Sequence, residues 1–169
     1  MAMPVLPDVL GPDLRVVFCG SAAGAVSAAR GAYNAGPGNR FWRILAETGL
    51  TPRRLAPAEF PAVLAWGIGL TDIVKTASGS DADLPRAAYD VDGLIARIRA
   101  CRPRLVAFNG KNAAAAFYRR PSAALGYGPG EQVAGFPPVW VLPSTSGAAF
   151  GVWNAACWYA LARAVADLD

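Results

Sequence analysis

Two glycine-rich segments of this sequence combine residue types that can bind an anionic or polar ligand. Residues 20–24 read GSAAG and follow an apolar stretch, so a strand is expected to end there in a turn of small residues. Residues 36–42 read GPGNRFW and place Asn39 just ahead of an amphipathic helix. Backbone N–H groups at such turns and helix starts attract anions and polar oxygens. The two segments therefore predict a ligand site built from backbone dipoles and a few polar side chains.

Three further polar segments follow apolar stretches later in the chain. Asp72 lies within the apolar stretch 68–74, which runs into the serine-containing loop 76–80. Two later apolar stretches end at the polar turns 109–111 (NGK) and 143–147 (PSTSG). The carboxyl ends of parallel strands share one edge of a sheet, and ligands bind there. We therefore expect all five segments to meet at one site.

The elements that position these segments alternate along the chain. Strands are expected at 14–19, 68–74, 105–108 and 139–142, and helices at 40–48, 57–65, 90–100, 111–118 and 153–168. This order predicts an α/β fold, a three-layer α/β/α sandwich with a central four-stranded parallel sheet, in a single domain over residues 1–169. Asn39 is expected to cap its helix and Gly49 to end it. The Gly- and Pro-rich segment 126–138 is expected to be a loop.

Composition excludes several kinds of chemistry. The chain has no histidine, which excludes Ser-His-Asp and Cys-His triads and histidine metal sites. Its three cysteines lie far apart in the sequence, which is typical of reduced thiols in a cytosolic protein. This spacing provides no set of close cysteine ligands, so no metal or cofactor is expected. The net charge of +4 allows a nucleic-acid partner without requiring one. No apolar run is long enough for a membrane span and the N-terminus does not read as a secretory signal, so a cytoplasmic location is expected.

The five segments together resemble the uracil-DNA glycosylase superfamily. The matching segments are 20–24, 36–42, 67–74, 108–111 and 142–147, in the same order, so the resemblance extends over most of the chain. The mismatch-specific uracil/thymine-DNA glycosylase branch is most similar, and the last two segments also resemble hypoxanthine-DNA glycosylases. The resemblance implies an enzyme that flips a damaged base out of DNA and cleaves its N-glycosidic bond.

The sequence departs from this family at three positions. In the mismatch-specific branch an Asn of the first segment helps to hold the attacking water, and here that position is Ala22, whose side chain forms no hydrogen bond. The family's base-stacking aromatic is replaced by Asn34, with Tyr33 beside it, and the last segment begins with Ser144 where His or Asn is usual. The similarity to hypoxanthine-DNA glycosylases makes Asn39 the candidate to hold the water instead. Helix capping alone is the alternative role of Asn39.

Asp72 has two candidate roles in such a site. A carboxylate can accept a hydrogen bond from uracil N3–H or hypoxanthine N1–H, or it can orient water and stabilise a cationic sugar. The alternative is a structural carboxylate bound by loop N–H groups. Tyr33 either stacks on the base or covers the core, and Ser21 is expected to help cradle an oxygen. The candidate catalytic residues are Asn39, Asp72 and Ser21, and the candidate base-binding residues are Gly20, Ala22, Ala23, Tyr33, Asn34 and Asn109.

Candidate DNA contacts lie in the same segments. The short hydroxyl side chains of 144–146 suit phosphate contacts, although they also suit helix capping. Arg40 and Lys111 are candidate phosphate ligands, and Phe150 is a candidate wedge between bases, with a core position as the alternative. The candidate DNA-binding residues are Arg40, Ser78, Ser80, Lys111, Ser144, Thr145, Ser146, Gly147 and Phe150.

We therefore expect a monomeric, monofunctional DNA N-glycosylase that acts on uracil in single- and double-stranded DNA. Hypoxanthine and other deaminated bases in DNA are further candidate substrates. Two alternatives stay open. One is a catalytically inactive DNA- or nucleotide-binding module, which the absence of the usual Asn at Ala22 favours. The other is an α/β enzyme that binds a small phosphorylated molecule with the same loops.

Overall fold

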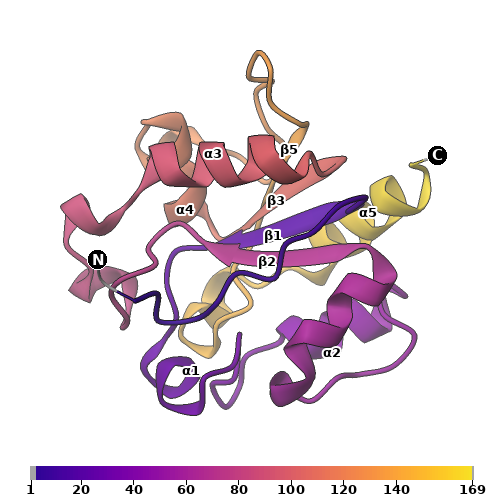
Figure 1. Ribbon diagram of the computed structural model, residues 1–169, viewed down its shortest axis with the longest axis horizontal. Coiled ribbons are helices and arrows are strands. Elements are labelled where there is room, and N and C mark those ends of the chain that lie inside the picture. The colour runs from indigo at the N-terminus through magenta and orange to yellow at the C-terminus, as the bar shows by residue number, and fades with distance from the viewer. Residues whose placement is uncertain (1–2, 169) are drawn as a thin grey trace.

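A five-stranded sheet forms the centre of the computed structural model, which describes residues 3–168 (Figure 1). Its order is β2-β1-β3-β5-β4. The strands β1 (Val16–Gly20), β2 (Ile68–Asp72), β3 (Leu105–Asn109) and β5 (Val139–Leu142) run parallel to one another. The predicted α/β sandwich with four parallel strands is therefore confirmed.

The fifth strand corrects the prediction of an uninterrupted loop over 126–138. β4 (Gly128–Pro129) has two residues and pairs antiparallel with Trp140 and Val141 of β5. A glycine and a proline carry no strand signal of their own, because neither residue favours extended pairing. Gly128 also has a φ of 107°, which side-chain-bearing residues rarely adopt. The pairing of β4 thus depends on its neighbour β5, and no local pattern in the sequence predicts it.

Helices cover both faces of the sheet. α3 (Val91–Cys101) and α4 (Lys111–Tyr118) lie on one side, and α1 (Ala25–Arg30) and α2 (Phe41–Glu47) lie on the other (Figure 1). α5 (Ala155–Ala166) contributes Trp158 and Leu161 to the same core as α2. This arrangement follows from the parallel strands, which bury both faces.

Alternate side chains of β1 point to opposite faces of the sheet and belong to two different hydrophobic cores. Val16 and Phe18 join the core under α2 and α5, where Phe18 stacks on Trp158 at 5.5 Å between ring centroids. Val17 and Cys19 join the core under α3 and α4. Burial of both faces explains why the strands read as continuous apolar runs rather than as alternating patterns.

Two helical segments differ from their predicted form. Residues 57–65 were expected to be an ordinary helix, whereas Pro57–Trp66 is a 3₁₀ helix that contains Pro61, a residue without the N–H that an α-helical hydrogen bond needs. The last helix was expected from residue 153 and begins instead at Ala155. Gly147–Val152 forms a separate 3₁₀ turn before it, and the Asn154 side chain accepts from the Ala156 N–H at 3.1 Å and so caps α5.

The N-terminal segment runs along the outer side of β2. Val9 and Leu70 exchange two backbone hydrogen bonds of 2.9 and 2.8 Å, and the Val5 N–H donates to the Lys75 carbonyl at 2.7 Å. These contacts place residues 5–9 beside the carboxyl end of β2. Within residues 3–168, no helix has the length and apolar character needed to cross a bilayer.

Candidate active site

The carboxyl ends of β1 and β2 bring Gly20 and Asp72 side by side. The two residues are paired in the strand register, and a Cβ atom placed on Gly20 would lie only 2.8 Å from Asp72 Oδ1. Beyond the strands, the Ile73 N–H donates to the Gly20 carbonyl at 3.0 Å and the Val74 N–H donates to the Ser21 carbonyl at 2.7 Å. The glycine turn and the end of β2 therefore form one rigid unit in which only glycine leaves room for the carboxylate.

The Asp72 carboxyl group is buried, with 7% of the residue exposed. Burial raises its pKa to about 6, and the nearby charge of Asp8 also raises it, while Lys75 and Arg97 lower it. Among residues 3–168, no group donates a hydrogen bond to this carboxylate. Loop N–H groups, the structural alternative considered for Asp72, do not bind it here. Near neutral pH the group is thus a largely ionised acceptor that is readily protonated.

The remainder of the glycine turn contacts the loop after β2. The Gly79 N–H donates to the Ala23 carbonyl at 3.0 Å, and Ala23 forms a parallel bridge with Ser78. Ala22 is half-buried against the core under α3 and α4, so its methyl group contributes packing. The Ser80 hydroxyl donates to Asp83 at 2.8 Å. Ser78 therefore lies next to the glycine turn, whereas the Ser80 side chain is turned toward a neighbouring acid.

The sequence predicts Asn39 as the N-cap of α2, whereas Arg40 occupies that position without a side-chain hydrogen bond, and Asn39 binds the first turn from one residue further out. Its Oδ1 accepts from the Phe41 N–H at 3.0 Å, and its Nδ2 makes a long contact of 3.5 Å with Asn34 Oδ1. Asn34 has a φ of 51°, a left-handed conformation that Asn tolerates better than most residues. Gly49, with a φ of 80°, follows the end of the helix. The Asn39 amide N–H groups are thus only weakly engaged, while its oxygen holds the helix.

Tyr33 lies in the core and is 4% exposed. Its hydroxyl donates to the Pro7 carbonyl at 2.9 Å, and its ring centroid is 5.4 Å from that of Phe60. The Trp42 indole N–H donates to the Tyr33 carbonyl at 2.9 Å, which fixes the backbone as well. This packing favours the core role that the sequence left open, because the ring offers no free face to a base.

Asn109 and Thr145 join the ends of β3 and β5. Thr145 is fully buried and forms two hydrogen bonds with the Asn109 amide, which also occupy the Asn109 side chain. Gly110 has a φ of 108°, and a Cβ on it would lie 3.3 Å from the Ser144 Cβ. Asn109, predicted to bind the base, and Thr145, predicted to bind DNA, are therefore placed to hold the loop 143–147 in position.

The loop 143–147 contacts the segment 36–42. A Cβ on Gly147 would lie 3.3 Å from the Pro37 carbonyl oxygen, and the Arg40 N–H donates to the Thr145 carbonyl at 2.9 Å. The Ser144 and Ser146 hydroxyls accept from the backbone N–H groups two residues further on, at 3.2 and 3.3 Å. The structure thus brings two of the predicted segments into direct contact at the carboxyl edge of the sheet.

The remaining candidate DNA contacts differ in exposure. Phe150 projects from the 3₁₀ turn with 71% of its surface exposed. The Lys111 Nζ lies 4.5 Å from the centre of the Tyr127 ring. The Arg40 guanidinium lies 5.4 Å from the centre of the Trp153 ring, and its Nη1 is buried without a hydrogen bond. Phe150 is therefore the most accessible of these side chains, and Arg40 packs partly into the protein.

Sequence reasoning missed a charged group behind Asp72. Asp8 Oδ1 lies 2.7 Å from Lys75 Nζ, its Oδ2 lies 3.2 Å from Arg97 Nε, and Thr71 Oγ1 donates to Oδ1 at 2.7 Å. One signal was available, because the arginine-rich chain places a rare lysine three residues after Asp72. The partner Asp8 was not detectable, since it is distant in sequence.

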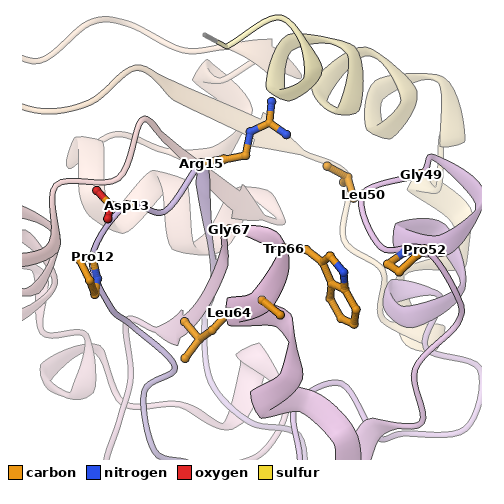
Figure 2. Close-up of a pocket in the computed structure, with 10 residues that line it drawn as sticks. Pro12, Asp13, Arg15, Gly49, Leu50, Pro52, Leu64, Trp66 and Gly67 are labelled. Carbon is orange, nitrogen blue, oxygen red and sulfur yellow. The ribbon is translucent and has the colours of Figure 1, made fainter.

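Two hollows of the surface are lined by residues outside the candidate set. One of about 620 Å³ is at the amino ends of β1 and β2, and Arg15, Leu64 and Trp66 are among the residues that line it (Figure 2). Another of about 770 Å³ lies between the segment 81–91 and α4. Neither is lined by a candidate catalytic residue. In the described part of the chain, no cluster of three His, Cys, Asp or Glu side chains is placed to hold a metal ion.

Comparisons with known proteins identify the family and the fold. The family model described as the uracil DNA glycosylase superfamily matches residues 7–164, a range that includes every candidate site residue. A solution NMR structure of a candidate uracil DNA glycosylase from Methanosarcina acetivorans has the same fold, with a TM-score of 0.66 and 24% sequence identity. That match covers 95% of this chain and 96% of the other.

Proposed function

Because this chain belongs to the uracil DNA glycosylase superfamily, whose members act on DNA, we propose that it is a monofunctional DNA glycosylase that removes uracil. The observation that carries the proposal is the buried carboxylate of Asp72 against Gly20, at the carboxyl ends of β1 and β2. A buried carboxyl group without a hydrogen-bond donor is costly unless it has a ligand to bind. A flipped base supplies N–H and C=O groups of the right kind.

Asp72 is the proposed reader of the base. In its ionised form it accepts a hydrogen bond from uracil N3–H or from the equivalent N1–H of hypoxanthine. In its protonated form it donates to a base carbonyl instead. Since its pKa is raised to about 6, both forms are populated at mildly acidic pH, while the ionised form dominates at neutral pH. Uracil is the substrate proposed from the family, and hypoxanthine is a further candidate because it offers an equivalent N–H.

Asn39 is the proposed water-positioning group in place of the side chain lost at Ala22. Its Oδ1 is occupied by the Phe41 N–H at 3.0 Å, whereas its Nδ2 has only the 3.5 Å contact to Asn34. An amide N–H that is this weakly held is available to a water or to the departing base. The bond to the base breaks first, the base leaves as an anion stabilised by hydrogen bonds, and water captures the sugar cation and gives up its proton to the departed base anion. Ser21 is the alternative group for the water.

The proposed DNA grip consists of the loop 143–147 and the turn after it. Contact between Gly147 and Pro37 fixes the loop relative to α2, and Phe150 extends from it into solvent. An exposed aromatic side chain at this place is suited to fill the gap that a flipped nucleotide leaves. Lys111, at the start of α4, is a proposed phosphate ligand.

An incubation with uracil-containing oligonucleotides followed by alkali tests the proposal, because alkali cleaves DNA at the abasic site that a glycosylase leaves. We expect strand cleavage on single-stranded and U·G substrates and slower cleavage on hypoxanthine. Base extrusion costs a few kcal/mol in a duplex, so single strands should react fastest. Fluorescence anisotropy on the same oligonucleotides measures binding in parallel. Binding without cleavage on any substrate would contradict the proposal and favour the inactive DNA-binding module that Ala22 suggests.

A further inference from the structure

We propose that Asp8 is a positioning residue for the candidate site, because its carboxylate binds Lys75 and Arg97 and thereby keeps both cations from pairing with Asp72. The proposal rests on the proposed function, which gives Asp72 its role toward the base. It assigns a task to the N-terminal segment, which contains none of the candidate catalytic residues.

The ion pairs around Asp8 are close and partly shielded from water. Lys75 Nζ lies 2.7 Å from Asp8 Oδ1, and the side chains of these residues are 13% and 25% exposed. Arg97 Nε lies 3.2 Å from Oδ2, in an ion pair without an aligned hydrogen bond. Within residues 3–168, neither cation forms an ion pair with Asp72. Asp8 therefore holds both positive charges in ion pairs of its own.

Both cations lie near enough to Asp72 for their charges to act on it, and we expect them to pair with it if Asp8 released them. Arg97 Nη2 donates to the Asp72 backbone carbonyl at 3.0 Å. Lys75 follows β2 directly, and its Nζ donates to the Tyr33 hydroxyl at 3.3 Å. Flexible side chains anchored this near an unpaired carboxylate would be drawn to it, since opposite charges attract strongly at partly buried sites. The Asp8 carboxylate competes successfully for them because it sits between the two.

Backbone pairing holds Asp8 in this place. Its neighbour Val9 exchanges two hydrogen bonds with Leu70, and the Val5 N–H donates to the Lys75 carbonyl at 2.7 Å. The Thr71 hydroxyl adds a bond of 2.7 Å to Asp8 Oδ1. The carboxylate is thus fixed by the same strand that carries Asp72, so the two acids keep a constant spacing.

The charged and titratable groups around Asp72 come from several elements. They are Asp8 in the N-terminal segment, Cys19 in β1, Tyr33 before α2, Lys75 after β2, and Arg97 in α3. Burial, and then the charge of Asp72, raises the pKa of both the Cys19 thiol and the Tyr33 hydroxyl, so both stay neutral. Loss of the Asp8 charge would remove a group that raises the pKa of Asp72 and would free two that lower it.

Asp8→Asn tests the proposal, with Glu59→Gln as the matched control. Glu59 pairs with Arg53 at 2.7 Å on the surface, so the control also removes one paired carboxylate. Carbon-detected NMR titration of the Asp72 carboxyl group and single-turnover cleavage across pH are measured for each. In Asp8→Asn we expect the pKa of Asp72 to fall by about one unit, a tenfold change in its proton affinity, and cleavage at pH 7 to fall about tenfold. The control should match the wild type in both.

Rescue separates this role from a merely structural one. In Asp8→Asn with Lys75→Gln, one freed cation is gone, so the pKa of Asp72 and the cleavage rate should return most of the way to wild type. An unchanged Asp72 pKa in folded Asp8→Asn, or failure of the double variant to recover, would overturn the proposal. The proposed function fails separately, since a wild-type protein that cleaves no substrate still yields the titration of Asp72.

A second variant applies if Asp8→Asn does not fold. Lys75→Gln alone should raise the pKa of Asp72 by less than about one unit, because Lys75 acts on it only from a distance. A rise of about two units or more is typical of losing a direct ion pair. That result would show that Lys75 pairs with Asp72 in solution, and it would overturn the proposal.

Discussion

Asn109 and Thr145 bind each other through two hydrogen bonds that run in opposite directions. Asn109 Nδ2 donates to Thr145 Oγ1 at 2.9 Å, and the Thr145 N–H donates to Asn109 Oδ1 at 3.0 Å. Both ends of the amide are therefore used inside the protein. The end of β3 and the loop after β5 behave as one unit, which keeps the proposed DNA grip at a fixed place.

We predict that Asn109→Ala destabilises the protein by about 1–3 kcal/mol, because it leaves buried polar groups of Thr145 unsatisfied. Urea denaturation followed by circular dichroism measures the change. Asn112→Ala is the control, since Asn112 on α4 is exposed and its amide donates only to the exposed Asp81 side chain, so stability should change by less than about 0.5 kcal/mol. Equal stability of the two variants would mean that the paired hydrogen bonds contribute nothing to the fold.

We predict that Asp72→Asn lowers cleavage and raises stability at the same time. Single-turnover cleavage of uracil-containing DNA should fall by about 10²-fold or more, the scale of losing one preorganised polar group. The folded pKa of about 6 lies above the model value of 3.8, so the folded state binds the proton more tightly. Wild-type stability therefore declines as pH rises from about 4 to about 6 and stays lower above that.

The stability gain of Asp72→Asn should consequently depend on pH. It should reach up to about 3 kcal/mol at pH 8, where the wild-type group is ionised and buried, and vanish near pH 4. Urea denaturation at the two pH values measures it. A gain that is equal at both would show that ionisation of Asp72 has no part in it.

We predict that Gly20→Ala impairs the reaction through steric displacement of Asp72. The new methyl group would lie 2.8 Å from Oδ1, so the carboxylate has to move. A displacement of about 1 Å in a reacting group can cost about 10²-fold in rate, and we expect a loss of about tenfold or more. Gly126→Ala is the control, because a Cβ there meets nothing within 4 Å. Single-turnover rates that are alike in both variants would show that this spacing is unimportant.

We predict that Asn39→Asp separates helix capping from catalysis. Asp caps helices as well as Asn, so the bond from the Phe41 N–H and the melting temperature should be retained. The substitution removes the amide N–H groups, and single-turnover cleavage should fall by about 10²-fold. Ser21→Ala is the comparison. If Asn39→Asp cleaves normally and Ser21→Ala does not, the water is positioned by Ser21.

The fold was predictable because its signals are local. Apolar runs that end in glycine or polar turns mark the four parallel strands, and Asn39 and Gly49 mark the ends of α2. The meeting of Gly20 with Asp72 followed from the rule that parallel strands share their carboxyl edge. These inferences needed no knowledge of which side chains touch.

The parts that could not be predicted depend on contacts between distant segments. Tyr33 reads equally well as a base-stacking or a core residue, and its burial with the bond to the Pro7 carbonyl distinguishes the two. The ion pairs of Asp8 arise because the N-terminal segment returns along β2, which no periodicity announces. The strand β4 exists only through its pairing with β5.

The pairing of Val9 with Leu70 also affects the solubility of the protein. β2 lies at the margin of the sheet, and the N-terminal segment covers part of its outer backbone. A chain shortened to begin at Leu14 would leave these N–H and C=O groups of β2 unpaired. Edge strands with unpaired backbone groups pair with the same strand of other molecules. The same few residues that hold Asp8 in place thus also protect the sheet from edge-to-edge aggregation.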